Sequence, residues 1–107
     1  MTAKYNVIYT PVAKEDLKNI YRYIAFDLVE PKIAEQQVNR IRTCIIKLEQ
    51  FPKKHPAVEW EPWSSIGMRF VPVDNYVVYY LVNDDNLLVT IVRIFYGGRD
   101  IKNIIPK

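Results

Sequence analysis

Residues 67–100 read GMRFVPVDNYVVYYLVNDDNLLVTIVRIFYGGRD, and this stretch decides the fold. Its runs 67–73, 76–82 and 87–96 are rich in β-branched and aromatic residues, which predicts three consecutive strands. In the first run Met68 and Phe70 alternate with Arg69 and Val71, so the two pairs should face opposite sides of the sheet. Residues 72–75 and 83–86 carry the Pro, Asp and Asn side chains that favour turns. Hairpin connections between the strands are therefore expected.

Basic residues interrupt these otherwise apolar strands. Arg93 lies in the middle of the last run, and burying a charge without a partner is costly. We therefore expect at least one face of the sheet to meet solvent or a partner molecule.

The N-terminal half predicts one strand and two helices. Residues 5–9 favour a strand, and Thr10 and Pro11 are suited to cap and start a helix. Apolar residues then recur at three- and four-residue steps over 13–28, which predicts an amphipathic helix. A second apolar stripe begins after Pro31 and runs to Phe51, where Pro52 ends it. So short a link predicts an antiparallel helical hairpin.

The order of these elements predicts an α+β fold. An N-terminal strand and a helical hairpin precede three hairpin-linked strands, so the hairpin should pack on one face of a mostly antiparallel sheet. We expect residues 1–107 to form a single domain, long enough to bury a core.

Composition restricts the class of protein. The net charge of +3, from 15 basic and 12 acidic residues, fits either an anionic partner or a mildly basic soluble domain. The one cysteine, Cys44, excludes an internal disulfide, and no signal peptide or membrane-spanning run is apparent. We therefore expect a cytoplasmic protein without membrane contact. Cys44 lies beside the second helical stripe and should be a small buried hydrophobe.

Residues 52–65 are irregular and rich in proline. Trp60 and Trp63 are expected to cover the core, with a partner-binding surface as the alternative. His55 is interpreted as an exposed loop residue rather than a catalytic one, and Lys53 and Lys54 are candidate target-binding residues.

The familiar catalytic and metal-binding signatures are absent from the sequence. It has no Gly-rich phosphate loop, no Cys/His cluster with metal-ligand spacing and no Ser/His/Asp set, so we expect no metal and no cofactor. Arginines and tyrosines remain on or beside one sheet. RNA cleavage through the ribose 2′-hydroxyl needs a base, a cation that stabilises the transition state, and an acid. Alternatively, the tyrosines pack the core and the arginines pair with carboxylates. The candidate residues are Arg69, Tyr76, Tyr79, Arg93, Tyr96 and Arg99.

The chain resembles the RelE/ParE toxins of bacterial type II toxin–antitoxin modules. The resemblance rests on the pattern A-x-x-D-L-x-x-I-x-x-Y-I over 13–24, Phe51-Pro52, Gly67-x-Arg69, Tyr76-x-x-Tyr79 and Gly97-x-Arg99-Asp100, in order and at similar spacing. It implies a RelE/ParE-like fold and a growth-inhibiting toxin that a cognate antitoxin neutralises.

The resemblance implies one of two targets. RelE-like members are ribosome-dependent endoribonucleases that cleave mRNA, whereas ParE-like members poison DNA gyrase. Carried over to this chain, Arg69, Arg99, Tyr76 and Tyr96 are the candidate catalytic residues, and Arg93, Tyr79, Lys53 and Lys54 the candidate RNA- or target-binding residues. Tyr76 stands where RelE-like nucleases carry arginine, and the tail after Ile101 offers no tyrosine or histidine. These departures favour the gyrase-directed reading over the nuclease. An inactive module that only binds an antitoxin is the further alternative.

Overall fold

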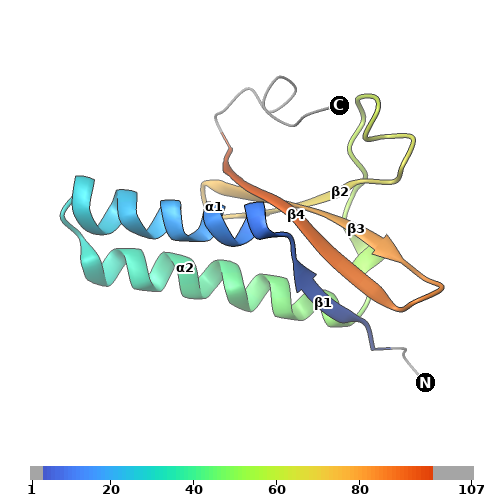
Figure 1. Cartoon of the computed structure of the whole chain (residues 1–107), viewed down its shortest axis with the longest axis horizontal. Helices are drawn as coiled ribbons and strands as arrows, with labels where there is room; N and C mark the ends of the chain where they lie inside the picture. Colours follow the sequence, from blue (N-terminus) through green and yellow to red (C-terminus); the bar gives the residue numbers. More distant parts are fainter. Residues whose placement is uncertain (1–3, 98–107) are drawn as a thin grey trace.

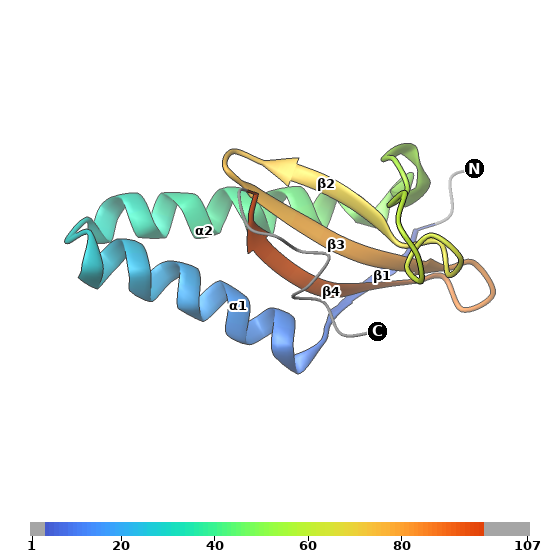
Figure 2. The ribbon, with the colours of Figure 1, turned by 90° about the horizontal axis from the view of Figure 1, so that it is seen from above.

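The computed structural model describes residues 4–97, in which a helical hairpin packs against a four-stranded sheet (Figures 1 and 2). The tip of the hairpin projects beyond the sheet in both views. Arg99, Asp100 and the tail from Ile101 lie outside the described residues. The elements are β1 (Asn6–Tyr9), α1 (Pro11–Arg22), a π-helical turn (Tyr23–Asp27), α2 (Pro31–Ile46), 3-10 turns (Lys47–Glu49 and Pro52–Lys54), β2 (Arg69–Val73), β3 (Tyr76–Asn83) and β4 (Leu88–Tyr96).

The first helix begins as predicted and ends earlier. The Thr10 hydroxyl accepts a hydrogen bond from the Ala13 amide at 3.0 Å, and Pro11 occupies the first turn. Regular α-helix ends at Arg22, and the chain continues as the π-helical turn, in which the Leu28 amide donates to the Tyr23 carbonyl. The apolar periodicity continues through this turn, so the sequence pattern alone did not show the change of hydrogen bonding.

The second helix buries the predicted stripe. Ala34, Val38, Ile41 and Ile45 all face the core. Cys44 was expected to be buried and is only half-buried, because it lies at the margin of this stripe. Desolvation nevertheless raises the pKa of its thiol above the usual value.

The sheet has the strand order β1-β4-β3-β2. The pairs β2–β3 and β3–β4 are antiparallel, and β1 pairs parallel to β4. The mostly antiparallel sheet predicted from the sequence is thus confirmed. The short strand β1 covers β4 only from Leu88 to Ile91, so the outer edge of β4 beyond Ile91 needs other partners.

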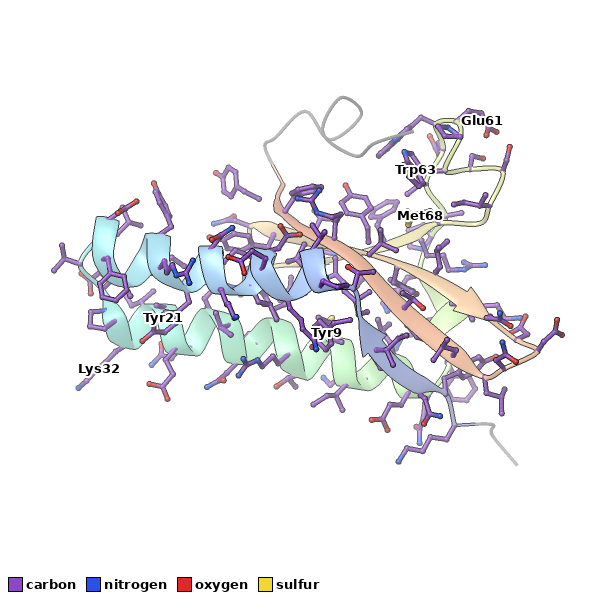
Figure 3. The ribbon with its side chains drawn as sticks, in the orientation of Figure 1. Tyr9, Tyr21, Lys32, Glu61, Trp63 and Met68 are labelled. Atoms are coloured by element: carbon purple, nitrogen blue, oxygen red, sulfur yellow. The ribbon has the colours of Figure 1, made fainter. Side chains whose placement is uncertain are left out.

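Both faces of the sheet are covered, each by a different part of the chain. The helices cover a face that includes Val71, Val78 and Tyr80. On the other face Trp60 and Trp63 pack, partly buried, against Met68 and Tyr79, which confirms that the tryptophans cover a core; Trp63 and Met68 are labelled in Figure 3. Within residues 4–97 no helix has the length and apolar character that crossing a membrane requires.

Candidate functional site

A groove separates the projecting half of the hairpin from the ends of β3 and β4. It has a volume of about 680 Å³ and is lined mainly by apolar and aromatic side chains from α1, the π-helical turn, α2 and both strands. We call it the hairpin–sheet groove and define it by Tyr23, Leu28, Ile33, Tyr76 and Tyr96. None of the described residues that line it is a lysine, arginine or histidine.

A β-bulge places two of the predicted site residues opposite each other in this groove. Tyr80 pairs with Ile91 and Tyr79 pairs with Arg93, which leaves Val92 as the extra residue of β4. Because of this extra residue, Tyr76 lies opposite Tyr96 rather than Phe95. The Tyr76 and Tyr96 rings meet edge to face, with their centroids 5.9 Å apart.

The tyrosines of the groove are suited to binding rather than to proton transfer. Burial, followed by the neighbouring Tyr23 and Tyr96 phenols, raises the pKa of Tyr76 above its ordinary value. A tyrosine that acts as a general base near neutral pH needs a lowered pKa instead. Tyr96 is 53% exposed and Tyr23 52% exposed, so both present aromatic surface and a hydroxyl to a partner.

Arg93 has an internal partner beside this groove. Its Nε and Nη2 donate to the two carboxylate oxygens of Asp16 at 2.8 and 3.1 Å, and its guanidinium lies 4.2 Å from the centre of the Phe95 ring. The expectation that Arg93 needs solvent or a partner molecule is therefore wrong, because α1 supplies the carboxylate. Its role in target binding remains a prediction.

Asp16 and Thr10 also complete the edge of β4 that β1 leaves uncovered. One Asp16 oxygen accepts a hydrogen bond from the Ile94 amide at 3.0 Å. The Thr10 hydroxyl donates to the carbonyl of Val92, the bulged residue, at 3.0 Å. Helix α1 thus takes the place of a strand along this edge.

Arg69 lies at the other end of the sheet from Tyr76 and Tyr96. It pairs with Tyr80, four residues along β3 from Tyr76, which corresponds to about 13 Å of strand. Its Nη1 donates to the carbonyls of Lys53 and His55 at 3.1 and 2.6 Å, so Arg69 fastens the segment after α2 to the sheet.

Lys53 and Asp84 form a polar cluster at the same end as Arg69. The Lys53 ammonium lies 2.9 Å from one Asp84 oxygen, and the Tyr5 hydroxyl donates to the other at 2.6 Å. These two hydrogen bonds hold the pKa of the Asp84 carboxyl below its usual value. Burial, followed by the charges of Lys54 and Arg69, lowers the pKa of His55 below its ordinary value and so favours the neutral imidazole.

The remaining predicted residues lie neither with Tyr76 and Tyr96 at one end of the sheet nor with Arg69 and Lys53 at the other. Tyr79 is buried among Phe70, Met68 and Phe95 on the face of the sheet that Trp60 and Trp63 cover. Lys54 is an exposed residue of the 3-10 turn Pro52–Lys54. Arg99 lies outside residues 4–97. Within that described part, no group of three or more His, Cys, Asp or Glu side chains could hold a metal ion.

Comparison with known proteins identifies the family. The model of the ParE toxin of the type II toxin–antitoxin system parDE matches residues 7–101, which is most of the chain. The chain belongs to the ParE toxin family. A search of curated protein sequences finds no significant match.

Two solved structures have the same fold as this ParE-family toxin. The chromosomal ParDE system of P. aeruginosa superimposes with a TM-score of 0.71 at 22% identity, over 88% of this chain and 97% of that chain. The RelBE2 toxin–antitoxin complex of Mycobacterium tuberculosis gives a TM-score of 0.64 at 19% identity, over 87% and 98%. The predicted RelE/ParE-like α+β fold is thus confirmed.

Sequence reasoning missed two residues that shape the site of this ParE-family toxin. Tyr23 was treated as part of an amphipathic helix, although its ring lines the hairpin–sheet groove. Asp16 was quoted only within a family pattern, although it holds Arg93 and the edge of β4. The Asp16–Arg93 pair could have been predicted from one signal. An acidic residue lies on the helix face that packs toward a strand, and that strand carries a single arginine.

Proposed function

We propose that this ParE-family toxin inhibits DNA gyrase by binding it, acts in the cytoplasm, and is held inactive by a cognate antitoxin. Membership of the ParE family carries the proposal, because the ParE-like branch of the superfamily is the one directed at gyrase. No cofactor or metal is needed for inhibition by binding.

The distribution of the predicted catalytic residues supports binding over RNA cleavage. Cleavage needs a base, a cation and an acid around one phosphate. In the part of the chain that the structure describes, Arg69 lies about 13 Å of strand away from Tyr76, and no cation lines the groove that holds Tyr76 and Tyr96. The raised pKa of Tyr76 further disfavours it as a base.

The exposed tip of the hairpin also favours a protein target. Phe26 is 70% exposed, Val29 74% and Leu28 52%, on the part of the hairpin that projects beyond the sheet. Neighbouring exposed apolar side chains of this kind are typical of protein–protein contact surfaces.

Purified toxin is expected to block supercoiling of relaxed plasmid by gyrase, at toxin concentrations comparable with that of the enzyme. The same protein should leave mRNA uncut on translating ribosomes, as measured by primer extension. The control is gyrase with toxin that has been preincubated with its antitoxin, which should supercoil normally.

Two results would count against this proposal. Cleavage of ribosome-bound mRNA at codon boundaries with unimpaired gyrase would assign the RelE-like activity instead. Normal growth of cells that express the toxin without antitoxin would leave only an inactive antitoxin-binding module.

A further inference from the structure

Three tyrosine rings gather in the hairpin–sheet groove. Tyr76 of β3 and Tyr96 of β4 meet edge to face, and Tyr23 of the π-helical turn lines the same groove. Burial is the main cause of the raised pKa of Tyr76, and the phenols of Tyr23 and Tyr96 are close enough to add to it. We call these three rings the tyrosine cage. Its members come from three elements far apart in the sequence, so the cage exists only in the folded toxin.

The polar groups of the tyrosine cage are available to a ligand. Among residues 4–97, the tyrosine hydroxyls that form hydrogen bonds are those of Tyr5 and Tyr80, neither of which belongs to the cage. The three phenol oxygens of the cage can therefore accept hydrogen bonds from another molecule. Asn75, which also lines the groove, offers a side-chain carbonyl beside them. A ligand rich in N–H donors would suit this set of acceptors.

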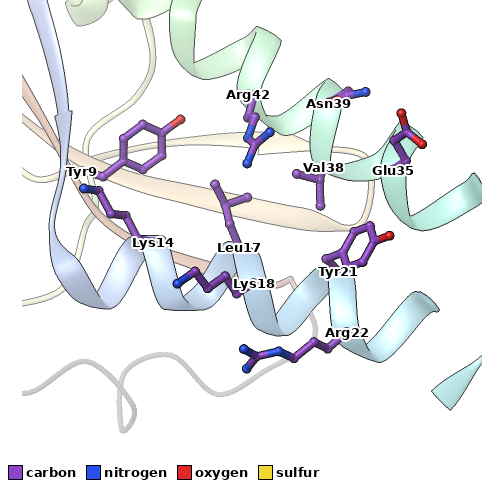
Figure 4. Close-up of a pocket in the computed structure, with 10 residues that line it drawn as sticks. All are labelled: Tyr9, Lys14, Leu17, Lys18, Tyr21, Arg22, Glu35, Val38, Asn39 and Arg42. Atoms are coloured by element: carbon purple, nitrogen blue, oxygen red, sulfur yellow. The ribbon is translucent and has the colours of Figure 1, made fainter. Parts of the chain in front are cut away.

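The toxin places its cations elsewhere. A separate groove between α1 and α2 is bordered by basic side chains: Lys14, Lys18, Arg22 and Arg42 (Figure 4). No lysine, arginine or histidine is among the described residues that line the hairpin–sheet groove, and its one carboxylate, Asp16, is paired with Arg93. A positive charge is thus the one kind of group that this groove lacks and could receive.

The hairpin tip next to the groove is acidic. Asp27 and Glu30 are exposed and stand close in sequence to Leu28, which lines the groove. Neither forms a salt bridge with another residue of the described range 4–97. Lys32, at the start of α2, points away from the sheet (Figure 3). An approaching cation would therefore meet a favourable potential at the tip.

The backbone of the tip is held in an unfavourable conformation. Val29 has a φ of 55°, in the left-handed region that a β-branched residue rarely adopts. The turn before it is π-helical, and both features are typical of functional sites. This backbone leaves the side chains of Phe26, Leu28 and Val29 exposed beside the groove.

An arginine side chain fits this combination of features. Its guanidinium carries five N–H donors and no acceptor, and its flat face stacks on aromatic rings. A cation over a tyrosine face is also attracted by the ring quadrupole. The toxin itself shows this contact beside the groove, where the Arg93 guanidinium lies 4.2 Å from the centre of the Phe95 ring. A phosphate or carboxylate, in contrast, would find no cation in the described lining with which to pair.

We propose that the tyrosine cage binds an arginine side chain of gyrase, and that apolar residues flanking this arginine cover Phe26, Leu28 and Val29 of the tip. This inference rests on the proposed function and specifies which surface of the toxin holds the target and through which chemistry. The cage supplies the contact with the charge, and the tip supplies the apolar area around it.

The direct test uses a fluorescent six-residue peptide with one arginine between leucines, titrated with the full-length toxin and followed by anisotropy. A second peptide carries citrulline, which keeps the shape of arginine without its charge, and should bind at least about fivefold more weakly. Tyr96→Leu should weaken binding of the arginine peptide by a similar factor. Tyr96→Phe keeps the ring and should stay within about threefold of the parent. Tyr23→Leu should behave like Tyr96→Leu, because it removes a second ring of the cage from a different element.

The matched control is Tyr21→Leu, which removes a tyrosine of α1 that lines the separate groove between the helices (Figure 4). It should bind the arginine peptide within about twofold of the parent. Equal binding of the arginine and citrulline peptides, no binding of either, or equal weakening by Tyr96→Leu and Tyr21→Leu would overturn the proposal.

Two other occupants of the cage are tested in the same way. Binding of the arginine peptide at least about fivefold tighter to Arg99→Gln than to the parent would overturn the proposal, because an arginine of the chain itself would then compete for the cage. Self-association of the parent toxin in sedimentation, abolished by Tyr96→Leu, would overturn it as well, because a second copy would then occupy the cage.

Supercoiling assays separate failure of this inference from failure of the proposed function. Half-inhibition of gyrase should require at least about fivefold more Tyr96→Leu than parent toxin, whereas Tyr21→Leu should inhibit like the parent. Undiminished inhibition by both Tyr96→Leu and Tyr23→Leu would reject the cage and leave the toxin function intact. A parent toxin that leaves gyrase unimpaired would reject the function, whatever the peptides do.

Discussion

Replacing Asp16 with alanine is expected to lower the free energy of unfolding by about 3 kcal/mol, which is the cost of removing one partner from a largely buried ion pair. The Asp16 side chain is 11% exposed and that of Arg93 20% exposed. The Asp16 carboxylate accepts two hydrogen bonds from Arg93 and one from the Ile94 amide. Its removal therefore leaves both the Arg93 charge and the Ile94 N–H without these acceptors. Urea unfolding followed by circular dichroism measures the loss.

Two variants distinguish this explanation from a general effect of changing α1. Glu15→Ala removes the exposed pair with Arg22 and should cost less than about 1 kcal/mol. Asp16→Leu combined with Arg93→Met replaces the pair by apolar side chains and should recover a large part of the lost stability. Equal stabilities of Asp16→Ala and Glu15→Ala would show that the pair contributes little.

The fold could be predicted from the sequence because each helix and strand is indicated by residues that lie close together in the chain. Three features can be recognised from residues only a few positions apart in the sequence: the Thr10 cap, the apolar stripe from Ala34 to Ile45, and the apolar runs of β3 and β4. The features that could not be predicted depend on contacts between residues far apart in the sequence. Arg93 and Asp16 are 77 residues apart in the sequence. The Asp16 carboxylate can be recognised as the partner of Arg93 only once the packing of α1 along β4 is known.

The candidate site was less predictable for the same reason. The sequence singled out Tyr76 and Tyr96, and the bulge at Val92 brought them together. Periodicity assumes an unbroken two-residue repeat, so one extra residue in a strand changes every later partner. The hairpin–sheet groove depends on how the hairpin packs beside the sheet, and that packing cannot be derived from any one helix or strand alone.

Raising the pH from about 9 to about 12 is expected to remove about 2–3 kcal/mol of stability through Tyr80 alone. Its side chain is fully buried, and desolvation raises the pKa of its hydroxyl from 10.0 to about 12, against a smaller opposing effect of the Arg69 charge. The folded state therefore favours the neutral phenol. A group whose pKa is raised on folding stabilises fully below its unfolded pKa, and this stabilisation is lost as the pH rises through the folded value.

Tyr80→Phe isolates this contribution, because phenylalanine keeps the ring in place and does not ionise. At neutral pH the variant should lose about 1 kcal/mol, since the Tyr80 hydroxyl donates a 2.6 Å hydrogen bond to the Pro52 carbonyl. As the pH rises, the parent should lose this advantage and become less stable than Tyr80→Phe by about 1–2 kcal/mol near pH 12. Tyr21→Phe, which alters an exposed ring, should follow the parent throughout. Parallel curves for the parent and Tyr80→Phe would assign the alkaline loss to other groups, since burial also raises the pKa of Tyr9, Tyr76 and Tyr79. The Tyr80 hydroxyl would then act only through its hydrogen bond, which joins the segment after α2 to the centre of the sheet.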